Sequence, residues 1–290
     1  MRRCLLVLLL LSPLLLLSPQ ARAGGIEHID LPSPSLGRPI PAYVYLPKGY
    51  AESRLSYPVL YLLHGFGGKD GDWLGQGNLE ATMDRLIAAG TIPPALVVMP
   101  SAGGSWYVDA ADMAGGEKLE TAFIRDLLPG IEKRYRVLAR RDGRLLGGLS
   151  MGGYGAMRFG LKFPEMFAAA ALFSPAIYNP EPPENSSARK VNVFGQPFDP
   201  ARWQALNYTA LLPGFLAKGL ALPTFIASGD DDEFQIELHA TLYYSALRRA
   251  RQPAELRIVN GAHSWAVWEG SLAEALAYIF QSAARPQVTE

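Results

Sequence analysis

Continuous apolar runs of strand length, separated by segments with helical spacing, constrain this fold more than any other feature. Residues 57–63 form such a run, and residues 95–99 form another. Such runs are typical of strands buried on both faces of a parallel sheet. Strands that alternate with helices indicate βαβ units, so we expect an α/β fold with a mostly parallel central sheet and helices on both faces. The predicted strands are Gly25–Leu31, Pro41–Leu46, Tyr57–Leu63, Ala95–Met99, Leu145–Leu146, Phe167–Phe173, Leu222–Ala227 and Leu256–Val259, and the predicted helices are Asn78–Ala89, Glu117–Tyr135, Gly153–Lys162, Phe234–Ala250 and Leu272–Phe280.

The first 23 residues have the pattern of a secretory signal peptide. Arg2 and Arg3 supply positive charge, Leu5 to Leu17 is an apolar tract, and Ala21-Arg22-Ala23 is a cleavage pattern. The alternative is a retained membrane anchor, but the tract is shorter than the ~20 residues that span a bilayer. We therefore expect cleavage and a secreted or periplasmic protein. Cleavage would also remove Cys4, the only cysteine.

Residues 24–290 are predicted to form a single domain. The chain has 27 basic and 27 acidic residues and no basic tract, which argues against nucleic-acid binding. Without cysteine, the mature chain has no disulfide, thiol nucleophile or cysteine metal site. No second apolar run is long enough to cross a membrane, and nothing in the sequence indicates an oligomeric state. Residues 174–213 are rich in proline, which predicts an irregular insertion that acts as a lid, a substrate-binding segment or a loop.

The stretch 148–152, Gly-Leu-Ser-Met-Gly, fits the pattern G-x-S-x-G. In this pattern a serine lies on a sharp turn between a strand and a helix, where its neighbours must be small. The context agrees, because a predicted strand precedes Ser150 and a predicted helix follows it. The pattern alone is weak in a chain with 29 glycines. It gains weight if an acid and a histidine follow in that order.

An acid and a histidine do follow, each after a predicted strand. Ser150, then Asp230-Asp231-Asp232, then His263 is the chain order of α/β-hydrolases. A serine hydroxyl needs a base within hydrogen-bond reach, and the base needs a carboxylate to orient it. We expect His263 to be the base. Asp232 is the preferred acid, with Asp231 and Asp230 as alternatives, whereas His28, His64 and His239 are expected to be structural.

Backbone N–H groups that could stabilise an oxyanion lie at two places. One belongs to Met151, directly after the serine, and the other to Phe66 in the glycine loop 64–68. His64, Gly65, Trp106, Tyr107 and Trp265 are candidates to line a substrate pocket. Core packing is an equally good interpretation of Trp106 and Tyr107.

Several of these motifs together resemble the putative-esterase family of α/β-hydrolases. That family includes esterase D (S-formylglutathione hydrolase), feruloyl and acetyl esterases, enterochelin esterases and mycolyltransferases. The resemblance covers roughly Ile40 to Phe280. The segments that carry it are Val59–Gly68, Leu86–Pro100, Gly103–Tyr107, Gly147–Gly153 and Gly261–Trp265.

The resemblance implies the α/β-hydrolase fold and a carboxylic ester hydrolase with a serine triad. By position, Ser150 resembles the nucleophile, His263 the base, and Met151 and Phe66 the oxyanion donors. The acid of the family commonly lies three residues after a strand-ending glycine, and Gly229 places it at Asp232. The proline-rich stretch matches no substrate-specific motif, and the export signal argues against cytosolic formaldehyde detoxification.

The sequence therefore predicts an exported serine esterase that acts through an acyl-enzyme. The substrate is expected to be a small-molecule, glycan or lipid ester. No metal or organic cofactor is implied, since HExxH, P-loop and GxGxxG patterns are missing from the sequence. The alternatives are an acyltransferase that uses the same triad on a sugar or lipid hydroxyl, a peptidase, and a non-enzymatic binding protein on a hydrolase scaffold, of which the last two are disfavoured.

Overall fold

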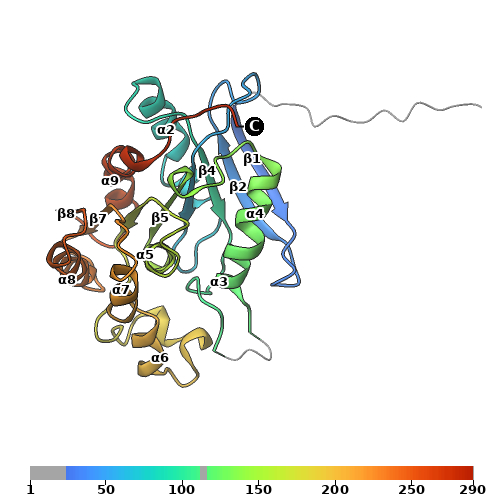
Figure 1. Cartoon of the computed structure of the whole chain (residues 1–290). Coiled ribbons are helices and arrows are strands. Elements are labelled where there is room, and N and C mark those ends of the chain that lie inside the picture. Colours follow the sequence, from blue (N-terminus) through green and yellow to red (C-terminus); the bar gives the residue numbers. More distant parts are fainter. Residues whose placement is uncertain (1–23, 112–115, 290) are drawn as a thin grey trace, which may run out of the picture.

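A computed structural model of the protein describes residues 24–111 and 116–289. The predicted signal peptide, with Cys4, lies outside the described residues. Eight strands form one sheet in the order β1-β2-β4-β3-β5-β6-β7-β8 (Figure 1). The pairs β1/β2 and β2/β4 are antiparallel and all other neighbours are parallel. The predicted, mostly parallel sheet is confirmed. The strands are β1 (Gly25–Leu31), β2 (Ile40–Leu46), β3 (Val59–Leu63), β4 (Leu96–Pro100), β5 (Arg144–Leu149), β6 (Ala169–Phe173), β7 (Thr224–Gly229) and β8 (Ala254–Val259).

Helices cover both faces of the sheet, as predicted (Figure 1). Alternate residues of β3 point to opposite faces, so Tyr61 joins one apolar core and Leu62 the other. On the Tyr61 face pack α3 (Leu119–Ala122), α4 (Leu128–Arg134), α5 (Met151–Lys162), α7 (Tyr208–Leu216) and α8 (Ile236–Arg249). On the Leu62 face pack α1 (Asp72–Gly75), α2 (Leu79–Ala88) and α9 (Trp265–Ile279). The central strands are buried on both faces, which explains their continuous apolar runs.

Two predicted helices differ from the structure. The helix expected over 117–135 is divided by a π-helical turn, η1 (Phe123–Leu127), which ends two residues before Pro129. Proline has no N–H and its ring clashes with the carbonyl four residues earlier, and a widened turn accommodates both effects. The last helix begins at Trp265 instead of Leu272, since Ser264 takes an extended conformation and begins it.

The proline-rich stretch 174–213 was predicted to be irregular, and this prediction is only partly right. It contains two 3₁₀ turns, η3 (Ser187–Arg189) and η4 (Asn192–Phe194), as well as α6 (Pro200–Ala205) and α7. The Asp199 side chain accepts hydrogen bonds from the N–H groups of Ala201 and Arg202, and Pro200 is the first residue of α6. Asn207 caps α7 in the same way through Tyr208 N. Such capping residues allow short helices in a proline-rich sequence.

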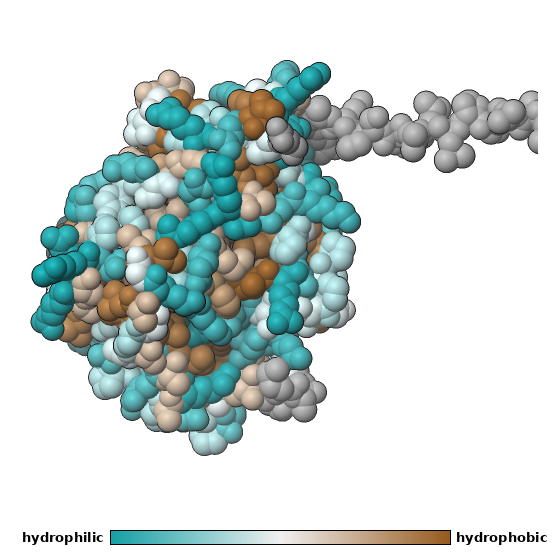
Figure 2. Space-filling model, in the orientation of Figure 1, coloured by the Kyte–Doolittle hydropathy of each residue, from teal (hydrophilic) through white to brown (hydrophobic). Residues whose placement is uncertain are grey.

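Hydrophilic and hydrophobic residues are interspersed over the face of the molecule that Figure 2 shows. Phe66 is one of few large apolar side chains that are exposed. Among residues 24–111 and 116–289, no helix combines the length and apolar character that crossing a membrane requires.

Candidate active site

Ser150 lies in a strained turn between β5 and α5. Its φ of 53° is in a region that a residue with a side chain rarely adopts. The glycines on either side make the turn possible: a Cβ on Gly148 would lie 2.4 Å from the backbone of Gly152, and a Cβ on Gly152 would lie 2.5 Å from the Leu63 carbonyl oxygen. The turn therefore holds the Ser150 side chain out at the carboxyl end of the sheet, as the G-x-S-x-G pattern predicts.

The structure brings Ser150, His263 and Asp232 together from the ends of three strands. His263 Nε2 is 2.9 Å from Ser150 Oγ, and His263 Nδ1 is 2.7 Å from Asp232 Oδ2. A carboxylate can only accept, so Nδ1 carries the proton and Nε2 accepts from the serine hydroxyl. The Asp232 side chain is fully buried and that of His263 is 11% exposed. This array can remove a proton from Ser150 and hold the resulting imidazolium.

The neighbouring acidic residues face other groups. Asp230 Oδ1 accepts a hydrogen bond of 2.9 Å from Gly261 N, and Glu233 Oε2 accepts one of 3.2 Å from His263 N. Asp231 is exposed, and its own N–H donates to the Gly261 carbonyl. Of the three adjacent aspartates, only Asp232 has a side-chain contact with the imidazole among the hydrogen bonds of the described residues.

Met151 and Phe66, the two predicted oxyanion donors, belong to different segments that adjoin Ser150. Met151 is the first residue of α5, so its N–H is one of the donors that a helix leaves free at its start. The glycine loop approaches from β3, and a Cβ on Gly65 would lie 3.5 Å from Ser150 Cβ. The start of α5 and the glycine loop therefore both adjoin the serine, and the oxyanion role of their N–H groups stays a prediction.

His64 fixes the geometry of the glycine loop. The Ala102 N–H donates to His64 Nε2 over 2.9 Å, which leaves Nδ1 as the donor to the Gly65 carbonyl at 2.7 Å. Gly68 N–H donates to the same carbonyl at 3.1 Å. In a trans peptide the C=O and N–H point in opposite directions, so the Phe66 N–H points away from His64. Burial lowers the pKa of His64, in keeping with a neutral ring.

A pocket of about 460 Å³ opens beside Ser150 and His263. Gly65, Phe66 and Leu149 line one part of it, while Trp265 and Trp268 of α9 line another. The polar residues at its edge are Asp72, Gln76 and Ser264. The pocket is large enough for a small ester and has both polar and apolar walls.

Three predicted pocket residues lie elsewhere. Trp106 is 1% exposed and packs edge-on against Tyr154, Phe194 and Trp203, while Tyr107 is fully buried. His64 is also buried and holds the loop from beneath. The prediction that these three line the pocket is therefore wrong, and core packing is the correct interpretation of the two aromatic residues. Gly65 and Trp265 do line it.

Trp268 is a site residue that the sequence interpretation missed. Its ring lies 5.0 Å from the His263 ring at 84°, and its Nε1 donates to Ser174 Oγ at 3.0 Å. Phe234 also packs edge-on against His263, with ring centroids 5.1 Å apart. Trp265 and Trp268 are three residues apart, a helical spacing that would have been informative had the helix been predicted to begin at Trp265.

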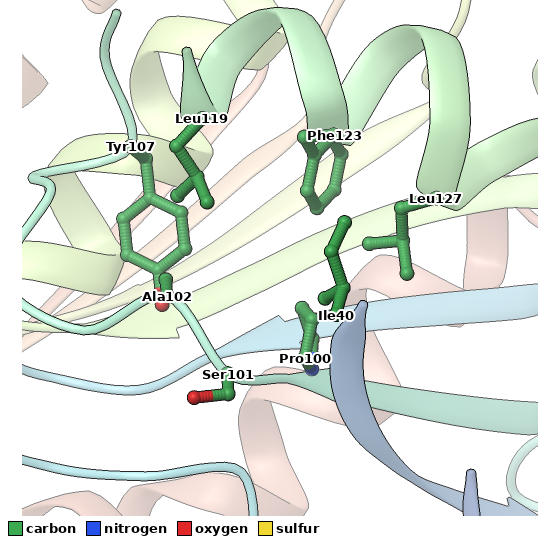
Figure 3. Close-up of a pocket in the computed structure, with 8 residues that line it drawn as sticks. All are labelled: Ile40, Pro100, Ser101, Ala102, Tyr107, Leu119, Phe123 and Leu127. Carbon is green, nitrogen blue, oxygen red and sulfur yellow. The ribbon is translucent and has the colours of Figure 1, made fainter. Parts of the chain in front are cut away.

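A much smaller cavity, shown in Figure 3, is not a candidate site. It lies under η1 and is bordered by Ile40, Tyr107, Phe123 and Leu127. Its volume of about 10 Å³ is no more than one water molecule requires, and its walls are nearly all apolar. Among the described residues there is also no group of three or more His, Cys, Asp or Glu side chains that could hold a metal ion.

Residues 33–279 match the family model described as "Putative esterase". An endo-1,4-beta-xylanase/feruloyl esterase of Xylanibacter ruminicola is 33% identical over 219 residues, which are 73% of this chain and 29% of that protein. An esterase of Mycobacterium tuberculosis is 40% identical over 133 residues, or 45% of this chain and 28% of that protein. The chain thus covers less than a third of the length of these relatives.

A solved structure is similar to this chain over nearly its whole described length. A ferulic acid esterase is 29% identical and superposes with a TM-score of 0.73, covering 90% of this chain and 99% of that one. The fold is therefore that of the α/β-hydrolase esterases, and the predicted fold is confirmed.

Proposed function

The chain belongs to the putative-esterase family, and from that premise we propose that it is an exported serine carboxylic-ester hydrolase. The observation that carries the proposal is the hydrogen-bonded array Ser150–His263–Asp232, with distances of 2.9 and 2.7 Å, at a pocket of about 460 Å³. The similarity to proteins named feruloyl esterase and ferulic acid esterase supports the same reaction class.

In the proposed reaction, Ser150 Oγ attacks the ester carbonyl while His263 Nε2 takes the hydroxyl proton. Two N–H donors, of Phe66 and Met151, stabilise the oxyanion. The tetrahedral intermediate collapses with cleavage of the bond to the alcohol, which leaves with the proton from His263. Asp232 orients the imidazole throughout.

Deacylation repeats these steps with water. His263 takes a proton from water as its oxygen attacks the acyl-enzyme carbonyl. The acid is released when Ser150 recovers its proton from His263. A single base thus serves both halves of the reaction.

Hydrolysis of p-nitrophenyl acetate, butyrate, octanoate and laurate by the mature protein tests this proposal. We expect Ser150→Ala to lower kcat by about four orders of magnitude or more, with the pocket determining which acyl chain is preferred. A Ser150→Ala variant as active as the wild type would overturn the assignment of the nucleophile.

An acyltransferase would form the same acyl-enzyme and pass the acyl group to an alcohol. The pocket of about 460 Å³ is lined by both Ser150 and His263, and Phe66 in its wall is 47% exposed, which leaves room for water to reach the acyl-enzyme and favours hydrolysis. Product analysis with glycerol, a sugar or a long-chain alcohol as acceptor separates the two. Hydrolysis predicts free acid as the main product in every case.

The proposal also includes export of the protein after cleavage of its signal peptide. The N-terminal residues of protein recovered from the culture medium or periplasm of a Gram-negative host should begin near Gly24 if the pattern Ala21-Arg22-Ala23 is cleaved. Recovery of uncleaved protein in the membrane fraction would support a retained anchor instead.

A further inference from the structure

A second hollow of about 450 Å³ lies next to the Ser150 pocket. Asp72 and Gln76, one helical turn apart at α1, line both hollows and stand between them. The second hollow extends from there to His28 and Tyr43, which belong to the antiparallel strands β1 and β2. A ligand with its reacting group at Ser150 could therefore extend over α1 into this hollow.

The side chains that line the second hollow are all polar or aromatic. The set comprises His28, Tyr43, Lys69, Asp70, Asp72 and Gln76, with glycine at the remaining positions. His28 Nε2 is 2.9 Å from Asp70 Oδ2, and the His28 ring lies 4.5 Å from that of Tyr43. Asp72 Oδ2 accepts from Lys69 N, which holds this carboxylate beside the glycine loop. The lining is thus partly preorganised by its own contacts.

This lining favours one class of ligand. A hydrocarbon chain would cover carboxylates and an amide without replacing their hydrogen bonds to water, which costs free energy. The charged groups of the lining are two carboxylates, Asp70 and Asp72, and one exposed cation, Lys69. An anionic group would therefore meet more negative than positive charge. A neutral, hydroxyl-rich group satisfies carboxylate, amide and phenol groups together, and an aromatic ring offers an apolar face to its C–H groups.

We propose that the second hollow binds the hydroxyl-rich alcohol part of the ester, such as a sugar unit, while the carbonyl lies at Ser150. The inference rests on the proposed esterase function and chooses, among glycan, phenolic and lipid esters, the polyol class. A polyol enters an ester through one of its own hydroxyl groups, so it is the alcohol component. We therefore expect the alcohol part of the substrate, and not the acyl part, in the second hollow.

The test compares three acetates that share one acyl group and differ in the alcohol: p-nitrophenyl acetate, a disaccharide monoacetate and dodecyl acetate. Gly75→Phe fills the hollow, because Gly75 lines it and no atom lies within 4 Å of a Cβ placed there. Gly214→Phe is the matched control, since a Cβ on Gly214 also meets no atom and this residue lies on α7, outside the hollow. Tyr43→Phe removes a phenol hydroxyl from the lining of the hollow, adds no bulk and keeps the ring that packs against His28.

Gly75→Phe is expected to lower kcat/KM for the disaccharide acetate about tenfold or more and to leave p-nitrophenyl acetate within about twofold of the wild type. Tyr43→Phe should act in the same direction and more weakly, while Gly214→Phe leaves all three substrates unchanged. Equal effects on all three acetates, or a preference for dodecyl acetate that the variants do not alter, would overturn the inference. If the wild type hydrolyses none of them, the proposed function itself fails.

Discussion

At the scale of single residues, the choice among three adjacent aspartates has a structural answer that can be tested. Only Asp232 reaches His263 Nδ1, at 2.7 Å, and it is buried where a carboxylate has few other partners. We expect Asp232→Asn to lower kcat by about four orders of magnitude, because an amide no longer favours the imidazole tautomer that accepts the serine proton. Steady-state kinetics with p-nitrophenyl acetate measure this.

Asp230→Asn and Asp231→Asn are the controls for that prediction. An asparagine oxygen at position 230 can still accept from Gly261 N, and Asp231 is exposed. Both variants should keep activity close to that of the wild type. A large loss in either, with Asp232→Asn active, would move the acid to that residue.

We infer that Trp268 is a positioning residue for the His263 imidazole. Its indole packs against the His263 ring and is anchored by the hydrogen bond to Ser174 Oγ. Phe173 and Ala176, on either side of Ser174 in the chain, form hydrogen bonds with the Ser150 backbone. One segment therefore supports both the nucleophile and Trp268, which packs against the catalytic base.

Trp268→Phe should keep a ring but lose this anchor, and we expect kcat to fall about tenfold with KM nearly unchanged. The pH profile of kcat is the second readout, since a displaced imidazole should shift its acidic limb. A change in stability alone, with kcat and the pH profile unaltered, would argue for a purely structural role.

At the scale of elements, buried strands and the helices between them could be predicted from the sequence, because periodicity and turn residues act locally. Helices α6 and α7 could not be predicted, since prolines dominate the stretch. Their caps, Asp199 and Asn207, are each a single residue, which is too weak a signal to indicate a helix. The burial of Trp106 and Tyr107 depends on α5 and the insertion packing over them, which no local pattern specifies. The turn at Ser150 could be predicted from the sequence, because close backbone contacts require glycine at positions 148 and 152.

The insertion is anchored by Trp203 and should not behave as a mobile lid. Trp203 is buried, stacks on Tyr154 with ring centroids 5.2 Å apart, and donates to the Tyr178 carbonyl at 3.1 Å. Trp203→Ala is expected to lower the free energy of unfolding by about 3–5 kcal/mol, as measured by urea denaturation. Gln204→Ala, exposed on the same helix, should change it by less than about 0.5 kcal/mol. A loss below about 1 kcal/mol at Trp203 would indicate a loosely attached insertion.

At the scale of the whole molecule, buried His64 links stability to pH. Burial lowers its pKa in the folded protein below the ordinary value of 6.5. As pH falls through 6.5, the unfolded chain binds a proton at this position and the folded chain does not, so stability decreases until the folded pKa is reached. The His64 contribution is therefore complete above pH 6.5 and is lost in acid.

His64→Gln removes this linkage. Between pH 7.5 and 5, the free energy of unfolding should decrease less in the variant than in the wild type, as followed by urea denaturation at each pH. At pH 7.5 the variant should be less stable by about 1–3 kcal/mol, because Ala102 N–H and the Gly65 carbonyl lose a partner. Identical pH dependence in the two proteins would show that His64 titrates normally.

The site as a whole depends on the parallel sheet, which brings the ends of β5, β7 and β8 to one edge. Ser150, Asp232 and His263 are distant in sequence. The G-x-S-x-G pattern, the order of serine, acid and histidine, and the position of each after a predicted strand together predict that they meet. The second hollow was not predicted, because it joins β1 and β2 to the loop after β3, and such contacts depend on the register of antiparallel strands.

The most direct test of the central claim is covalent labelling of the mature protein with a fluorophosphonate, followed by mass spectrometry of the intact protein and its peptides. We expect one adduct per molecule, located on Ser150, absent in Ser150→Ala and formed much more slowly in His263→Ala. An adduct on another residue, or unchanged labelling of Ser150→Ala, would contradict it.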